Sequence, residues 1–208
     1  MALQQIGAWA GIIAPILFTV LVIVESLLRS GYSQIYNYIS DLGVGPYAII
    51  QNANFIILGL LSLVFALGFG RTLAASSGRR ARSVVGIIVV FGLGTTMFAG
   101  ASLLFIAYFA YTLTAFIAFF TIIAAQLLTW RSLKNSDGKT WGRYRAYSLI
   151  SGLLSLILLF VFSSTLSTAY HGATERVFVA VPLIWIEVTG IKLHSLSKRT
   201  SPMQTPTT

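Results

Sequence analysis

Residues 29–54, RSGYSQIYNYISDLGVGPYAIIQNAN, decide the fold because they form a polar break between two long apolar segments. The stretch holds four of the nine tyrosines, the charged residues Arg29 and Asp41, and many turn-forming residues. Each flanking segment is long and apolar enough to cross a bilayer as a helix. The stretch is therefore expected to be an aromatic-rich loop at a membrane surface.

The composition excludes a water-soluble globule. Of the 208 residues, 56% are hydrophobic and 9% are charged, and the mean hydropathy is +0.84, so too few charged groups exist to cover a soluble surface. The net charge of +9 comes from short basic clusters between apolar runs, so nucleic-acid binding is not expected. The chain has no cysteine, which removes disulfides, thiolate catalysis and iron–sulfur ligation, and no cofactor is expected.

Six segments are long enough to span the roughly 30 Å hydrocarbon core of a bilayer. They cover residues 6–28, 49–73, 84–107, 111–130, 147–167 and 177–193. The first lacks a basic start and is too long for a cleaved signal peptide, so it should remain as a span. The predicted fold is all-α: one six-helix transmembrane domain over residues 1–197, followed by a short disordered tail over 198–208.

The basic residues predict the orientation. Twelve of the fourteen fall on one side of the predicted membrane: Arg71, Arg79, Arg80, Arg82, Arg131, Lys134, Lys139, Arg143, Arg145, Lys192, Lys198 and Arg199. Only Arg29 and Arg176 fall opposite. Because cytoplasmic loops concentrate Lys and Arg, both termini are expected in the cytoplasm of a cell-membrane, multi-pass protein.

Aromatic and small residues add two further expectations. Rings at both predicted membrane surfaces are typical of interface anchors: Trp9, Trp130, Trp141, Tyr144 and Tyr147 inside, and Tyr32, Tyr36, Tyr38, Tyr47, Tyr108, Tyr111 and Tyr170 outside. Glycines favour close helix contacts, namely the pair Gly7 and Gly11, and Gly86, Gly92, Gly94 and Gly100 on the third segment.

Several motifs together resemble the DUF998 family. They are GIIAP at 11–15, GY at 31–32, ISDLG at 39–43, Asn54 with Phe55, and Glu175–Arg176 followed by Trp185. The resemblance implies a six-helix integral membrane protein and no defined activity. The family often carries an acidic residue and a histidine in the link between the third and fourth helices, whereas residues 103–116 read LLFIAYFAYTLTAF here. A reaction that depends on those groups would be lost in this chain.

The predicted outer face gathers three of the five acidic residues, Glu25, Asp41 and Glu175, together with Arg29, Arg176 and His171. Ionisable groups near hydrocarbon are costly unless they are paired. A structural explanation pairs Glu25 with Arg29 at i, i+4, pairs Asp41 with Arg176, or uses Ser40 and Asp41 to cap a short helix. A functional explanation places Ser40 and His171 with a carboxylate for acyl transfer, or uses the carboxylates and His171 to hold a divalent metal. The candidate catalytic residues are Asp41, His171, Glu175 and Arg176.

Glu187 lies within the sixth segment, about 16 Å below Arg176 by helical rise. A carboxylate at that depth is a functional candidate, with Gln126 or Lys192 as its partner, or it reaches the cytoplasmic headgroups. The full set of candidate ligand-binding residues is Glu25, Arg29, Tyr32, Ser40, Asn54 and Glu187.

Three functions remain open from sequence. The first is a membrane protein of undefined function that binds membrane lipid, or that joins a membrane-protein subunit or a second copy of itself. The second is an interfacial enzyme acting on a lipid or lipid-linked substrate at the outer face. The third is a small proton-coupled transporter that uses Glu187. The enzyme requires Asp41, His171 and Glu175 to converge on one cavity, and the transporter requires a polar route to Glu187.

Overall fold

A computed structural model describes residues 2–78, 80–103 and 108–200, and within them the chain forms six long helices. These are α1 (Ala2–Leu28), α2 (Ala48–Ser77), α3 (Arg80–Leu103), α4 (Tyr108–Ser132), α5 (Gly138–Thr165) and α6 (His171–Thr200). Two short 3₁₀ helices, η1 (Ile39–Gly43) and η2 (Leu133–Asn135), lie in the connections. The predicted all-α fold is confirmed. Helix α6 runs to Thr200, and the rest of the predicted tail lies outside the described residues.

Five of the described helical segments are long and apolar enough to cross a membrane. The sixth apolar segment, Ala81–Met97 in α3, is shorter within the part of the chain that the structure describes. Many large apolar side chains point outward, as lipid contact requires, among them Leu27, Phe160 and Ile150. The chain is a multi-pass membrane protein.

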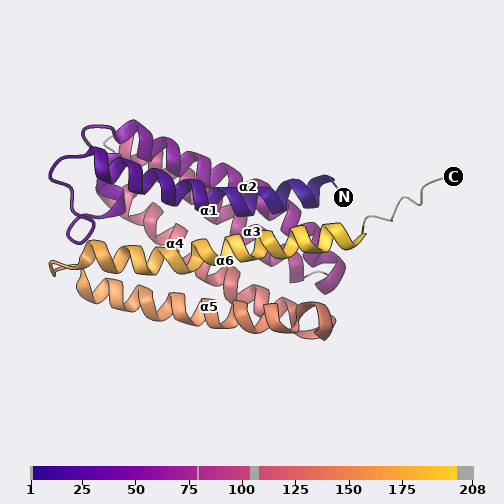
Figure 1. The fold of residues 1–208 in the computed structure, drawn as a ribbon. Coiled ribbons are helices and arrows are strands. Elements are labelled where there is room, and N and C mark those ends of the chain that lie inside the picture. The colour runs from indigo at the N-terminus through magenta and orange to yellow at the C-terminus, as the bar shows by residue number, and fades with distance from the viewer. Residues whose placement is uncertain (1, 79, 104–107, 201–208) are drawn as a thin grey trace.

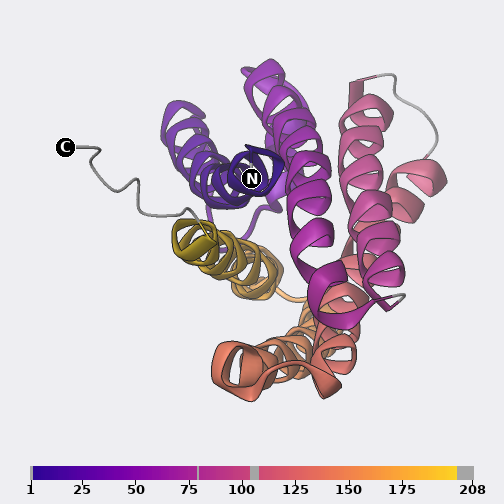
Figure 2. The same cartoon turned by 90° about the vertical axis from the view of Figure 1, so that its right-hand side faces the viewer.

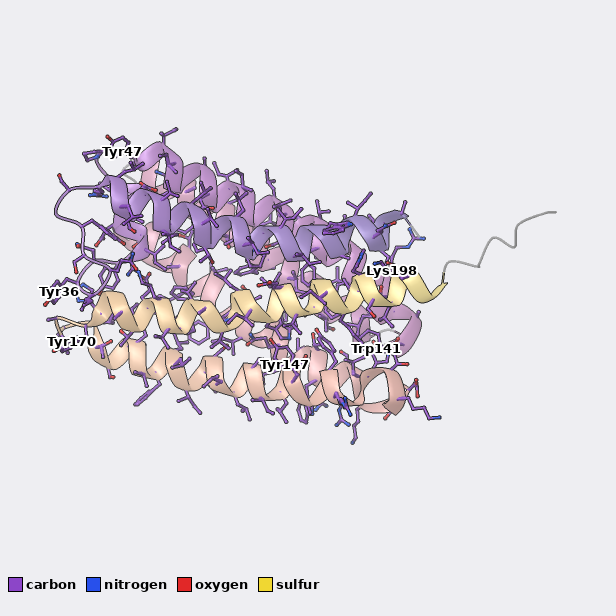
Figure 3. All side chains as sticks on the ribbon, viewed as in Figure 1. Tyr36, Tyr47, Trp141, Tyr147, Tyr170 and Lys198 are labelled. Atoms are coloured by element: carbon purple, nitrogen blue, oxygen red, sulfur yellow. The ribbon has the colours of Figure 1, made fainter. Side chains whose placement is uncertain are left out.

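The helices form a closed ring in chain order, since each packs on the next and α6 returns to pack on α1 (Figure 2). The start of α1 and the end of α6 lie at the same end of the bundle, called the terminal end below (Figure 1). The opposite end carries the α1–α2 and α5–α6 connections and is called the cap end. Tyr36, Tyr47 and Tyr170 lie at the cap end, and Trp141 and Lys198 at the terminal end (Figure 3).

Paired glycines bring neighbouring helices into backbone contact. A Cβ placed on Gly7 would lie 2.6 Å from Cα of Gly68, so α1 and α2 meet where neither residue has a side chain. Gly59 of α2 and Gly92 of α3 make a similar contact, with a Cβ on Gly59 lying 2.5 Å from the Gly92 carbonyl oxygen. Gly86 was expected to pack in the same way, but a Cβ there would meet nothing within 4 Å. It faces away from the bundle.

The core contains two rings that were expected at the membrane surface. Trp141 and Tyr144 are 4% and 6% exposed, so they are not headgroup anchors. The Tyr144 hydroxyl lies 2.6 Å from the Thr189 hydroxyl, which links α5 to α6. Other expectations for helix packing, interface anchoring and charge placement concern side chains that the structure does not describe, namely those of Gly100, Tyr108, Tyr111, Arg79, Arg80 and Arg199.

Candidate functional site

Residues 29–47, called the cap below, close one end of the bundle. Its centre is η1, the ISDLG segment, whose Ile39 and Leu42 side chains are buried. The Asp41 carboxylate accepts a hydrogen bond from the Tyr38 backbone N–H at 2.9 Å, which fixes the start of this turn. Asp41 thus has the helix-capping role that the structural explanation predicted.

Arg176 ties the cap to α6. Its Nη1 donates to the carbonyl oxygens of Asn37 and Gly172, both at 2.8 Å, and its Nη2 donates to the Tyr32 hydroxyl. That hydroxyl in turn donates to the Tyr38 carbonyl at 2.8 Å. The charged hydrogen bonds of one guanidinium therefore hold two points of the cap and the first turn of α6 together.

Gly172 allows the cap to approach α6 closely. A Cβ at this position would lie 2.3 Å from the Asn37 carbonyl oxygen, a distance that no side chain tolerates. The contact continues through the Ala173 N–H, which donates to the Ile35 carbonyl at 3.1 Å. The first turn of α6 thus packs directly against the backbone of the cap.

Tyr32 lies between two cations. The Arg29 and Arg176 guanidinium carbons are 6.0 and 5.6 Å from the centre of its ring. Burial raises the pKa of the Tyr32 phenol above its ordinary value of 10.0, and the charge of Arg176 and its hydrogen bond oppose that rise. Any stability linked to this raised pKa is present below pH 10 and is lost as the pH rises through the raised value.

The two ion pairs expected at this face are not formed among the described residues. Arg29 donates to the backbone carbonyl of Asp41, and Arg176 donates to carbonyls and a phenol, so neither guanidinium contacts a carboxylate. Glu25 is fully buried, and both of its carboxylate oxygens lack a hydrogen-bond partner in the described structure. Arginine here binds the backbone of the cap, because a folded loop supplies carbonyls at fixed positions.

Glu175 points inward although it is adjacent to Arg176. It is 6% exposed, and its Oε2 accepts a 2.6 Å hydrogen bond from the Ile39 N–H at the base of the cap. Ile39, Ser40 and Glu175 also line one cavity. Glu175 is therefore the candidate residue that joins the cap to the interior of the bundle.

This cavity measures about 90 Å³ and lies beneath the cap, with walls from α1, α2, α3, α4 and α6. Its polar lining among the residues that the structure describes consists of Ser40, Thr95 and Glu175. The Thr95 hydroxyl donates to the Phe91 carbonyl of its own helix at 2.8 Å. The remaining wall is apolar and is dominated by five phenylalanine rings: Phe18, Phe55, Phe91, Phe119 and Phe178.

Of the four candidate catalytic residues, only Glu175 lines the cavity. His171 lies at the cap surface, where its Nδ1 is 2.6 Å from the Thr168 carbonyl and its ring lies tilted against Tyr38, with the ring centres 4.3 Å apart. The described structure does not bring Ser40, His171 and a carboxylate together for acyl transfer. It also brings no three His, Asp or Glu side chains together in a group that would hold a metal ion.

Asn54 fastens α2 to α1. Its Nδ2 donates to the Phe18 carbonyl at 3.0 Å and to Gln51 Oε1 at 3.2 Å, and both amide side chains are fully buried or nearly so. Neither Asn54 nor the buried Glu25 lines the cavity. The structure therefore gives Asn54 a packing role.

Glu187 lies on α6 in the terminal half of the bundle, away from the cavity. The amide of Gln126, its proposed partner, is fully buried and makes no hydrogen bond within the described residues. Lys192, the other proposed partner, donates to the Thr140 carbonyl at 2.7 Å and lies 5.6 Å from the Trp141 ring centre. Gln126 therefore does not pair with Glu187 in the described structure.

Sequence reasoning missed the apolar wall of the cavity. Glu175, Phe178, Pro182 and Leu183 recur at helical spacing and share one face of α6, a pattern that was visible in the sequence. The pattern alone did not indicate a cavity, because lipid-facing and core-facing helix surfaces are equally apolar.

Comparison with known proteins gives one result. A family model described as "Protein of unknown function (DUF998)" matches residues 12–192, which include η1, Glu175 and the whole cavity lining. Neither a curated protein nor a solved structure matches the chain.

Proposed function

The chain belongs to the DUF998 family, whose description gives no activity, and we propose that it binds the hydrocarbon chain of a lipid in the cavity beneath the cap. The observation that carries this proposal is the apolar cavity itself, which is lined by residues of five of the long helices. Its position suits a ligand that arrives through the bilayer.

Energetics favour an occupied cavity. An empty apolar space of about 90 Å³ costs about 2 kcal/mol at the rate found for cavities in protein cores. Apolar cavities exclude water and accept apolar molecules of matching shape. A hydrocarbon chain recovers the missing van der Waals contacts with the phenylalanine rings, and the surrounding lipid supplies such chains at high concentration.

The two rival functions have weaker support. An interfacial enzyme needs a nucleophile, a base and an orienting group at one place. Of the residues proposed for these roles, Ser40 and Glu175 line the cavity, whereas Asp41 and His171 do not. A proton-coupled transporter needs a polar route to Glu187, and the cavity wall below Glu175 is apolar. Binding requires neither condition.

Photocrosslinking in nanodiscs tests the proposal. A phospholipid with a diazirine at the end of one acyl chain should label Phe178, which is fully buried, as well as Phe160, which is 77% exposed. Ala118 lines the cavity, so Ala118→Phe should fill it and remove the Phe178 label while the Phe160 label remains. Ala180 is exposed on α6, and Ala180→Phe serves as the matched control. Label at Phe160 alone in the unchanged protein would contradict the proposal.

We further propose that the cap faces the outside of a cell membrane and that both termini are cytoplasmic. The charge asymmetry supports this, since Arg131, Lys134 and Lys139 belong to the terminal end and only two basic residues belong to the cap end. The chain contains no cysteine, so single-cysteine labelling is unambiguous. In intact cells, Ser33→Cys should react with an impermeant maleimide, whereas Lys139→Cys should react only after lysis. The reverse labelling pattern would show that the protein has the opposite orientation in the membrane.

A further inference from the structure

Resting on the proposed function, we infer that the bound molecule carries a hydrogen-bond-donating head, a protonated amine or a hydroxyl, held by the Glu175 carboxylate and the Phe178 carbonyl. The inference assigns a head-group class to the cavity beneath the cap. It rests on the hydrogen-bond acceptors of the cavity wall and on the scarcity of donors among its described residues.

The Glu175 carboxylate has accepting capacity to spare. Among the described residues it makes one hydrogen bond, from the Ile39 N–H to Oε2 at 2.6 Å, and Oε1 accepts none. The two oxygens of a carboxyl group offer more than one acceptor position whether or not the group is ionised. Because Glu175 lines the cavity and is 6% exposed, its remaining acceptor positions are available from within the cavity.

Pro182 supplies a second acceptor on the same wall. Proline has no N–H, so a proline inside a helix leaves the carbonyl four residues earlier without its helical donor. Pro182 lies inside α6, and that carbonyl belongs to Phe178, one turn below Glu175. Glu175, Phe178 and Pro182 all line the cavity, so the residue whose carbonyl lacks its helical donor lies one helical turn from Glu175 on the same wall.

Among the described residues that line the cavity, few side chains can donate a hydrogen bond to these acceptors. The Thr95 hydroxyl donates to the Phe91 carbonyl, so Ser40 is the described lining side chain that remains able to donate. Arg29 and Arg176 direct their N–H groups to cap carbonyls and to Tyr32, and neither lines the cavity. A ligand must therefore bring donors, and a carboxylate head would be repelled by Glu175.

A series of ligands with one tail and four heads tests the inference. Dodecylamine, 1-dodecanol, dodecane and laurate are added to the full chain in a neutral detergent, and binding is measured by the rise in melting temperature. Dodecylamine and 1-dodecanol should bind about tenfold tighter than dodecane, as expected for one added charged or neutral hydrogen bond, and laurate should bind weakest.

Two variants distinguish binding of the head group from binding of the hydrocarbon tail. Glu175→Gln keeps an acceptor for Ile39 but removes the carboxylate, so it should remove most of the preference for the amine over dodecane. Ala118→Phe should remove binding of all four ligands. A rise in melting temperature that dodecylamine still causes in this variant is an effect of the amine on the micelle.

Equal binding of all four ligands would overturn this inference and leave chain binding intact. Absence of binding by all four would overturn both proposals, and tightest binding of laurate would overturn the head-group assignment alone.

Discussion

Replacing Gly68 with leucine should lower the free energy of unfolding by about 3 kcal/mol or more, the largest loss expected for a single residue here. A Cβ on Gly68 would lie 2.7 Å from Cα of Gly7 and 2.9 Å from the Leu3 carbonyl oxygen. These are backbone atoms, so the clash can be relieved only by moving α1 away from α2. Since glycine contacts are what hold helices together in lipid, separation removes the contact altogether.

The measurement is the melting temperature of the detergent-solubilised protein, followed by intrinsic tryptophan fluorescence. Gly86→Leu is the matched control, because it makes the same change in α3 where a Cβ meets nothing within 4 Å. It should be neutral or slightly stabilising, since glycine is a poor helix former by about 1 kcal/mol. Equal losses in the two variants would show that the α1–α2 contact is not made as described.

Replacing Arg176 with methionine should open the cap while the six helices remain folded. The change removes three donated hydrogen bonds, to the Asn37 and Gly172 carbonyls and to the Tyr32 hydroxyl, but keeps an apolar stem. We expect a local loss of about 2 kcal/mol, because Arg176 is only partly buried and water replaces part of each contact. Hydrogen exchange at the Ile39 and Ala173 amides should accelerate by about thirtyfold for that loss.

Two controls define this result. Arg143→Met removes an exposed arginine of α5 and should leave exchange in the cap unchanged. Arg176→Lys should restore little, because a single ammonium cannot reach three acceptors in the geometry of a guanidinium. Unchanged exchange at Ile39 in Arg176→Met would show that Glu175 alone holds the cap, through its hydrogen bond to that amide.

Much of the fold follows from local features of the chain. The six apolar segments predicted the number of helices and their order. Their boundaries differ from the prediction by several residues, since α5, for example, begins at Gly138 and ends at Thr165 where residues 147–167 were expected. The ISDLG motif marked the turn at the centre of the cap, where Asp41 caps η1. These features are predictable because helix formation in lipid depends on the segment's own length and hydropathy.

The roles of individual side chains were less predictable. Glu175 and Arg176 are adjacent in sequence, yet one lines the cavity and the other binds the cap backbone. Trp141 and Tyr144 occur where interface anchors are expected but pack inside the bundle. Each outcome depends on which neighbouring helix covers the residue, and that neighbour is distant in sequence.

The sequence by itself determined that this is a membrane protein of six helices, with a polar cap at one end and basic residues gathered toward the other. The tertiary structure alone decided that α6 closes the ring against α1 and that a cavity remains beneath the cap with Glu175 on its wall. The physical reason is that lipid and protein core are equally apolar to a helix. Hydropathy therefore fixes which segments enter the membrane, whereas only steric contact between side chains fixes which faces meet.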